Sequence, residues 1–260
     1  MWTKGEIFAD AYTHRENMVT GIEARTKLAF TVAALLINLL SPSPITPLAI
    51  ALFCIFTLLA IKIPPRLLLL RLALPLVTAS VVLVTQVFFY GATPMFTIPV
   101  LGFHLTGYTE GLTRGILIMS RVLGGISLIL LLSMSTPAHR LLLAAAWFRV
   151  PKVLVELSLL MYRYIFVLLE EVLTIRDAQR VRLGYRSWRQ SMRSLAILGS
   201  SLVLRAFDRA GRVFEAMTAR GYTGAMTVSY AASFQGRDYF VAGGLISLLA
   251  VFYFIGQVGA

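Results

Sequence analysis

Long apolar runs alternate with short polar links along most of the chain, and they predict membrane-spanning helices. The hydrocarbon core of a bilayer takes roughly 20 mostly apolar residues per helix, and in lipid only helices or closed barrels satisfy every backbone polar group. Five runs fit, of which the first is short: Leu28–Leu40, Ile45–Ile61, Leu72–Tyr90, Gly115–Ser135 and Tyr239–Val258. Gly91–Thr113 is a polar connection rich in glycine and proline. The pattern therefore predicts an all-α, polytopic membrane protein.

Residues 136–238 interrupt this pattern and predict two long amphipathic helices, because the segment is too long for a passive connection. The first helix opens after Pro151, a favourable first-turn residue, and runs to about Leu183; the second runs from about Ser191 to Ala219. Apolar residues of the second helix recur with 4-3-4-3 spacing, which is one face: Val203, Phe207, Ala210, Phe214 and Met217. Its arginines point elsewhere: Arg205, Arg209 and Arg212. We expect the two helices to pack on each other with these arginines in solvent.

A sixth span is the main alternative for the first of these helices, because Leu157–Leu169 is nearly all apolar. Four ionised side chains would then lie in or at the edge of the hydrocarbon: Glu156, Arg163, Glu170 and Glu171. Charged groups are costly at that depth, and a helix that lies on the membrane surface avoids the cost. We therefore predict five spans, with this helix outside the bilayer core.

The distribution of basic residues predicts which links face the cytoplasm. Basic links alternate with nearly neutral ones, and residues 136–238 hold fifteen Lys and Arg against seven acidic residues. Cytoplasmic links carry the excess of Lys and Arg, so the N-terminus is expected inside and the C-terminus outside. Four regions follow: a cytoplasmic arm over 1–27, four spans over 28–135, cytoplasmic helices over 136–238, and a fifth span with its tail over 239–260.

The composition agrees with lipid as the solvent of the chain. Hydrophobic residues make up 58% and charged residues 14%, with a mean hydropathy of +0.79, whereas about 25% of residues are charged in soluble domains. The net charge of +12 comes from 24 Lys and Arg against 12 Asp and Glu. Such an excess suits nucleic acid, anionic lipid or an acidic protein partner.

Signatures of catalysis and metal binding are absent from the sequence. It contains no G-x-x-x-x-G-K-[ST] loop, no H-E-x-x-H and no G-x-S-x-G. The histidines His14, His104 and His139 lie in separate segments, and Cys54 stands alone in an apolar run. Because a transition-metal site needs several converging ligands, we expect no catalytic residue, no metal site and no cofactor in this chain, and no enzymatic activity of its own.

Two similar helix ends lie within residues 136–238. One reads Ala178-Gln-Arg-Val-Arg-Leu-Gly-Tyr185 and the other Ala216-Met-Thr-Ala-Arg-Gly-Tyr222. In each, an arginine near the end of the helix is followed within two residues by glycine and then by tyrosine. One such end is ordinary, since glycine stops helices and the helix dipole favours a cation in the last turn. Two predict a pair of arginine-tipped ends, presented to a partner with two equivalent sites.

Further short motifs extend this pattern over nearly the whole chain: Ile22-Glu-Ala-Arg-Thr-Lys27, Val150-Pro-Lys152, Met161-Tyr-Arg-Tyr-Ile165 and Glu170-Glu171. With them, the chain resembles the transmembrane T component of energy-coupling-factor (ECF) transporters, in the cobalt/nickel CbiQ/NikQ-like branch. Ala24 replaces the proline that this family usually has in its entry motif. The helix ends match the family's paired Ala-Arg-Gly signatures, literally in Ala219-Arg220-Gly221 and in degenerate form in Val181-Arg182-Leu183-Gly184.

The resemblance implies a coupling subunit of an ATP-driven importer of cobalt or nickel ions in the bacterial cytoplasmic (inner) membrane. By match of motif, the residues that dock on a cytoplasmic CbiO-like ABC-type ATPase dimer are Arg182, Gly184, Ala219, Arg220 and Gly221. ATP and Mg²⁺ would bind to that ATPase. The other implied partners are a substrate-binding CbiM-like S component, a small CbiN-like accessory membrane subunit and the lipid bilayer. Nucleic acid is not an expected partner.

A self-contained secondary ion transporter or channel is the alternative function. It would need charged or polar groups deep in several spans, whereas the first, second, third and fifth predicted spans have no ionisable side chain at their centres. The fourth carries Arg121, which we expect to contact the helix bundle or to reach the outer interface. A membrane-embedded enzyme is a third candidate, and it lacks the catalytic motifs described above.

Overall fold

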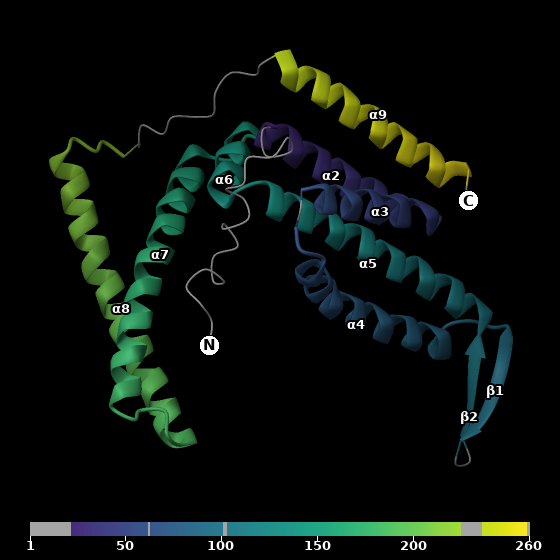
Figure 1. Cartoon of the computed structure of the whole chain (residues 1–260), viewed down its shortest axis with the longest axis horizontal. Coiled ribbons are helices and arrows are strands. Elements are labelled where there is room, and N and C mark those ends of the chain that lie inside the picture. Colours follow the sequence, from purple (N-terminus) through teal and green to yellow (C-terminus); the bar gives the residue numbers. More distant parts are fainter. Residues whose placement is uncertain (1–21, 62, 101–102, 225–235, 259–260) are drawn as a thin grey trace. The chain divides into compact units, whose positions relative to one another are not determined.

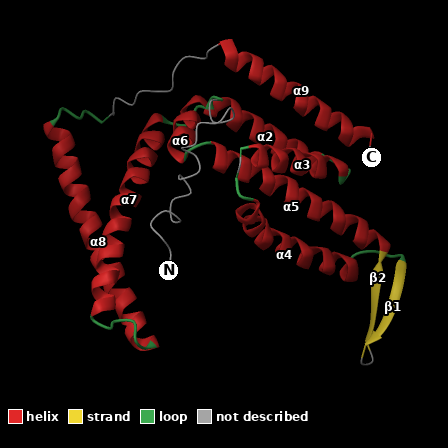
Figure 2. Cartoon of the chain, in the orientation of Figure 1, coloured by secondary structure: helices red, strands yellow, loops and turns green. Residues whose placement is uncertain are grey.

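The computed structural model describes residues 22–61, 63–100, 103–224 and 236–258 (Figure 1). Helices make up most of this part of the chain, together with one two-stranded hairpin (Figure 2). The elements, in order, are α2 (Ala24–Leu40), α3 (Ile45–Ala60), α4 (Pro65–Phe89), β1 (Pro94–Val100), β2 (Phe103–Tyr108), α5 (Thr109–Ser135), α6 (Ala138–Trp147), α7 (Lys152–Val181), α8 (Trp188–Ala219) and α9 (Gly236–Val258). The chain divides into two compact units, Met1–Ala144 with Ala232–Ala260, and Ala145–Ala231.

The first unit is built around α5, which packs against α2, α3 and α4, while α9 packs against α2 and α3. By length and composition α4 and α5 can each cross a membrane, whereas α3 and Ala242–Phe254 are apolar but shorter. Two clusters of buried side chains hold the bundle together. The first consists of Phe30, Ala34, Ile50, Cys54, Leu128 and Phe252, and the second of Leu58, Ile61, Ile63, Leu68, Leu72 and Met134.

Small residues let α5 approach its neighbours closely. A Cβ atom added at Gly124 would lie 2.5 Å from Oδ1 of Asn38 and 2.9 Å from the carbonyl oxygen of Pro47. At the same crossing the amide of Asn38 donates to the carbonyl of Arg121 (3.0 Å), and Arg121 Nη2 donates to the carbonyl of Ser41 (2.8 Å). Arg121 therefore makes a contact within the helix bundle, where a backbone carbonyl accepts a hydrogen bond from its guanidinium group.

The last residue of the entry motif, Lys27, binds the C-terminal end of α5. It is 7% exposed, and its Nζ donates to the carbonyl of Ser135 (3.1 Å) and to Oγ1 of Thr136 (3.3 Å). A cation placed at the C-terminus of a helix is favoured by the free carbonyl groups and by the helix dipole. The motif thus ties the start of α2 to the end of α5.

The structure corrects several sequence-based expectations about the elements. The predicted all-α class is confirmed, but the connection Gly91–Thr113 also contains the antiparallel hairpin β1–β2, which was not predicted; its paired backbone groups hydrogen-bond across the two strands. The helix α4 begins at Pro65 rather than Leu72, because Pro65 has the dihedral angle φ suited to a first helical position. The short helix α6 was not predicted. Five membrane crossings remain a prediction.

Candidate docking tips on helices α7 and α8

The second unit consists mainly of α7 and α8, an antiparallel pair (Figure 1). Both helices were predicted, although α8 starts at Trp188 rather than Ser191 because Ser187 caps it; the Ser187 side chain accepts from the backbone N–H of Gln190 at 3.4 Å. Since the helices are antiparallel, their C-terminal ends lie at opposite ends of the pair. The 32 residues of α8 separate these ends by about 48 Å, at ~1.5 Å per residue.

The end of α7, Val181–Gly184, is called the first tip. Arg182 is its C-cap residue, and Leu183 adopts the left-handed conformation with φ of 58°. The backbone N–H of Leu183 donates to the carbonyl of Arg180 (3.1 Å), and that of Gly184 donates to the carbonyl of Gln179 (2.9 Å). This pair of bonds is a Schellman motif, which satisfies carbonyl groups left free by the last turn.

The end of α8, Ala219–Tyr222, is called the second tip, and it repeats this geometry. Arg220 is the C-cap residue and Gly221 is left-handed with φ of 83°. The N–H of Gly221 donates to the carbonyl of Thr218, and that of Tyr222 to the carbonyl of Met217, both at 3.0 Å.

The arginines Arg182 and Arg220 occupy equivalent cap positions, and both are exposed. In this equivalence Leu183, and not Gly184, corresponds to Gly221. The glycines that made the two ends look alike in the sequence therefore have different structural roles.

The first tip is joined to the start of α8 by side chains that the sequence did not single out. The amide of Gln179 donates to the carbonyl of Ser194 (3.0 Å) and its oxygen accepts from the hydroxyl of Tyr185 (2.8 Å). The hydroxyl of Ser194 donates to the carbonyl of Gly184 at 2.8 Å. A Cβ at Gly184 would lie 2.7 Å from this hydroxyl oxygen, so the glycine permits the close approach of α8.

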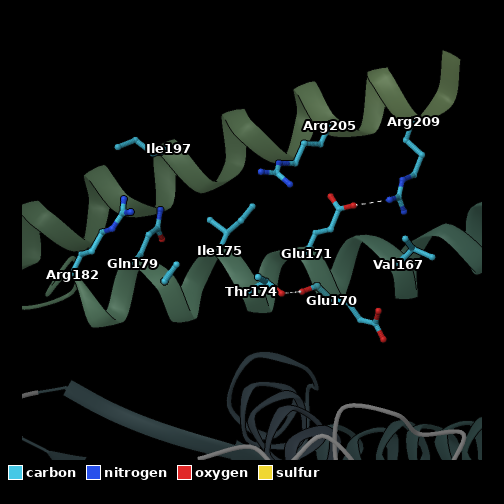
Figure 3. Close-up of a pocket in the computed structure, with 11 residues that line it drawn as sticks. Val167, Glu170, Glu171, Thr174, Ile175, Gln179, Arg182, Ile197, Arg205 and Arg209 are labelled. Carbon is cyan, nitrogen blue, oxygen red and sulfur yellow. Dashed lines mark hydrogen bonds and ion pairs between the residues drawn. The ribbon is translucent and has the colours of Figure 1, made fainter. Parts of the chain in front are cut away.

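A cleft of about 650 Å³ lies between the helices next to the first tip (Figure 3). Arg182, Arg205 and Arg209 line it together with Glu171, and in Figure 3 Arg205 points from α8 toward α7. Arg209 Nη2 forms an ion pair with Oε1 of Glu171 at 2.9 Å. The expectation that Arg209 points away into solvent was therefore wrong: it faces α7, because the flank of α8 that carries it turns toward the partner helix.

The apolar stripe expected on α8 is divided in the structure. Ala210, Phe214 and Met217 line an open groove against α7, whereas Val203 and Phe207 are exposed and lie outside it. The stripe drifts around the helix, since 3.6 residues per turn do not match a 4-3-4-3 repeat. The two helices thus pack as predicted only over part of their length.

Metal-binding side chains do not converge in the described part of the chain, where no group of three or more His, Cys, Asp or Glu could hold an ion. His139 lies half-buried on α6. His14 and the side chain of His104 fall outside the described residues. The Cys54 thiol is buried in the bundle.

Comparison with known protein families shows to which family the chain belongs. A model of the CbiQ family, described as cobalt transport protein, matches residues 15–230. The chain belongs to the CbiQ cobalt transport family. This match contains α2 to α8 and both tips, so the resemblance inferred from the sequence motifs is confirmed at the level of the family. With its long apolar helices, this member of the CbiQ family is a membrane protein.

Relatives of the chain occur in archaea and bacteria. An uncharacterized protein of Methanocaldococcus jannaschii is 34% identical over 80% of this chain and 78% of its own length. A putative fused cobalt transport protein CbiMQ of Methanocorpusculum labreanum is also 34% identical over 80% of this chain, which corresponds to 35% of the fused protein. The cobalt transport protein CbiQ of Rhodobacter capsulatus is 42% identical over 37% of this chain and 40% of its own length.

Proposed function

We propose that this chain is the transmembrane coupling subunit of an ATP-driven cobalt importer, and that it docks on a cytoplasmic ATPase dimer through Arg182 and Arg220. The observation that carries the proposal is the equivalence of the two tips. Both arginines are exposed C-cap residues of long helices, and both are followed by the same pair of capping hydrogen bonds. Two such ends on one chain suit a partner that offers the same site twice.

The geometry of the pair favours an ATPase dimer as this partner. Because α7 and α8 are antiparallel, the tips lie about 48 Å apart, at ~1.5 Å per residue of α8. That separation allows each tip to reach a different copy of a globular subunit. The planar guanidinium group binds carboxylates through two parallel hydrogen bonds, so an acidic groove on each ATPase copy is the expected receptor. ATP and Mg²⁺ are bound by that ATPase and not by this chain.

The remaining partners and the substrate follow from the family. A relative is named as a fusion of CbiM and CbiQ, which supports a CbiM-like substrate-binding subunit beside this chain in the membrane. In this arrangement the ion crosses through the partner, with a CbiN-like subunit as an accessory, and this chain transmits the ATP-driven movement. We propose cobalt rather than nickel as the substrate, because the family and its named relatives are described as cobalt transport proteins.

The orientation of the chain is part of the proposal. The basic residues of 136–238 favour a position of α7 and α8 on the cytoplasmic side of the inner membrane, with the N-terminus inside. An ATPase in the cytoplasm can reach the tips only in this orientation.

The direct test is co-purification of the co-expressed ATPase with the chain. Reversal of both charges, Arg182→Glu with Arg220→Glu, is expected to abolish recovery of the ATPase, because truncation of one buried charged contact costs about 2–5 kcal/mol at an interface. The matched control reverses two exposed arginines in the first turns of α8, Arg189→Glu with Arg193→Glu, and should retain the complex. Unchanged recovery with the first pair, in protein that still inserts into membranes, would refute the docking role. The purified chain alone should hydrolyse no ATP.

A further inference from the structure

A second hollow of the unit formed by α7 and α8 is lined by neither Arg182 nor Arg220, although Tyr222 of the second tip lies at it. It is a groove of about 490 Å³ between the first half of α7 and the second half of α8. Its walls are almost wholly apolar, and they include Leu157, Leu160, Met161, Ala210 and Met217. The groove lies within one compact unit, and all of these side chains are among the described residues.

Large apolar side chains remain open to the surroundings along this groove. Met161 is 58% exposed, Phe214 59% and Leu157 49%. Contiguous exposed apolar surface of this kind marks a site for a membrane or for another molecule, since water alone is a poor solvent for it. The two helices thus leave an apolar surface that a further apolar group can cover.

Basic side chains border one side of the groove. An adjoining hollow of about 380 Å³ shares Tyr164 and Val213 with the groove and is also lined by Arg163, Arg209 and Arg212. Arg209 is paired with Glu171, and among the described residues no ion pair involves Arg163 or Arg212. An apolar slot beside these two guanidinium groups is complementary to an amphiphile with an anionic head.

We propose that this groove binds one anionic phospholipid, with an acyl chain between α7 and α8 and the phosphate on Arg163 and Arg212. From Val153 to Leu168 the groove follows about 22 Å of α7, at ~1.5 Å per residue. One acyl chain spans about half of the ~30 Å hydrocarbon core, so the groove is long enough to hold it. Glu156 lines the groove toward its other end and is 7% exposed, which directs the anionic head toward the arginines.

Charge favours an anionic lipid over a helix of a partner protein. Two guanidinium groups, those of Arg163 and Arg212, border the apolar groove, and no ion pair involves them among the described residues. Anionic lipids of the cytoplasmic leaflet are attracted to clustered arginines, and this member of the CbiQ family lies in a membrane.

The proposal is tested with the full-length chain alone in vesicles that contain a phosphatidylglycerol with a photoactivatable acyl chain. Because no ATPase is present, the outcome is independent of the docking proposal. We expect cross-links in peptides that contain Leu157–Met161 and Val213–Met217. Arg163→Gln with Arg212→Gln should lower this labelling at least fivefold, since each basic residue contributes severalfold to the attraction of an anionic lipid. The matched control, Arg189→Gln with Arg193→Gln, should change it less than twofold.

A second variant tests the apolar part of the site. Ala210→Phe fills the groove without a change of charge and should lower the labelling of the same peptides, while circular dichroism shows retained helix content. Equal loss in the control pair, or equal labelling by a photoactivatable phosphatidylcholine, would overturn the proposal. Capture of a polypeptide instead of a lipid by a photo-cross-linking residue at Met161, in native membranes, would assign the groove to a protein partner and also overturn it.

Discussion

At the end of α7 the left-handed residue is Leu183, whereas at the end of α8 it is Gly221. A left-handed conformation costs an ordinary residue about 1–2 kcal/mol and costs glycine almost nothing. Leu183 nevertheless leaves 63% of its surface exposed, and Val181 leaves 85%. The first tip therefore presents apolar side chains around Arg182 at the expense of backbone strain, while the second tip presents Arg220 between two small residues.

The tips also differ in what holds them. The first is hydrogen-bonded to the start of α8 through Gln179, Tyr185 and Ser194. At the second, the backbone bonds of the cap lie within the end of α8 itself, and a Cβ at Gly221 would meet no atom within 4 Å. A force on Arg182 thus reaches both helices, whereas a force on Arg220 acts on α8. If the tips dock on an ATPase dimer as proposed, the two contacts are therefore not mechanically equivalent.

The two tips should differ most in their stability when the glycine of each, Gly184 or Gly221, is replaced by alanine. Gly184→Ala introduces a Cβ at 2.7 Å from Ser194 Oγ and 3.0 Å from the carbonyl oxygen of Gln179, and overpacking of this kind costs about 1–3 kcal/mol. Gly221→Ala meets open space and loses only the left-handed preference, about 1 kcal/mol. Hydrogen exchange measures the loss of stability at each tip. The amides to follow are those that make the capping bonds, at position 184 in the first tip and at Tyr222 in the second.

Removal of the Ser194 hydroxyl is the control for that comparison. Adding Ser194→Ala to Gly184→Ala should recover part of the protection, because residues in contact are not additive. Equal acceleration of exchange at both tips by the single alanine substitutions would show that the close approach of α8 does not distinguish them.

Replacement of Leu183 by glycine should have a smaller effect and should stabilise the first tip instead of destabilising it. Leu183→Gly removes the left-handed strain and should stabilise the first tip by about 0.5–1 kcal/mol, after allowance for the greater freedom of glycine in the unfolded chain. Exchange at the Gly184 amide should slow severalfold. Val181→Gly is the matched control, since it places glycine in the last helical turn and should accelerate exchange. Faster exchange in Leu183→Gly would show that the leucine side chain stabilises the cap.

Local signals in the sequence were sufficient for the helices that carry the tips. Pro151 marks the start of α7, and the arginine–glycine–tyrosine ends mark where α7 and α8 stop. The hairpin β1–β2 was missed because Pro94 and Pro99 in β1 and Gly107 in β2 are typical of an irregular connection. The start of α8 was placed three residues late because the cap formed by Ser187 was overlooked.

Contacts between the helices could not be predicted from the sequence. Whether Arg209 faces solvent or Glu171 depends on how α8 is rotated against α7, and the periodicity of α8 alone leaves that rotation open. The same holds for Gly184 and Ser194, whose close approach depends on the path of the turn between the helices. The equivalence of Leu183 with Gly221 was hidden because it depends on backbone angles and not on residue type.

Photo-cross-linking from the two tips tests the central claim most directly. A photoreactive residue in place of Val181, of Ala219, or of both would be carried by the chain in cells that co-express the ATPase. Each single variant should capture one ATPase copy, and the double variant should yield a product with the mass of the chain plus two ATPase copies. Capture of no ATPase from either tip, or of a single copy joined to both tips, would contradict the account.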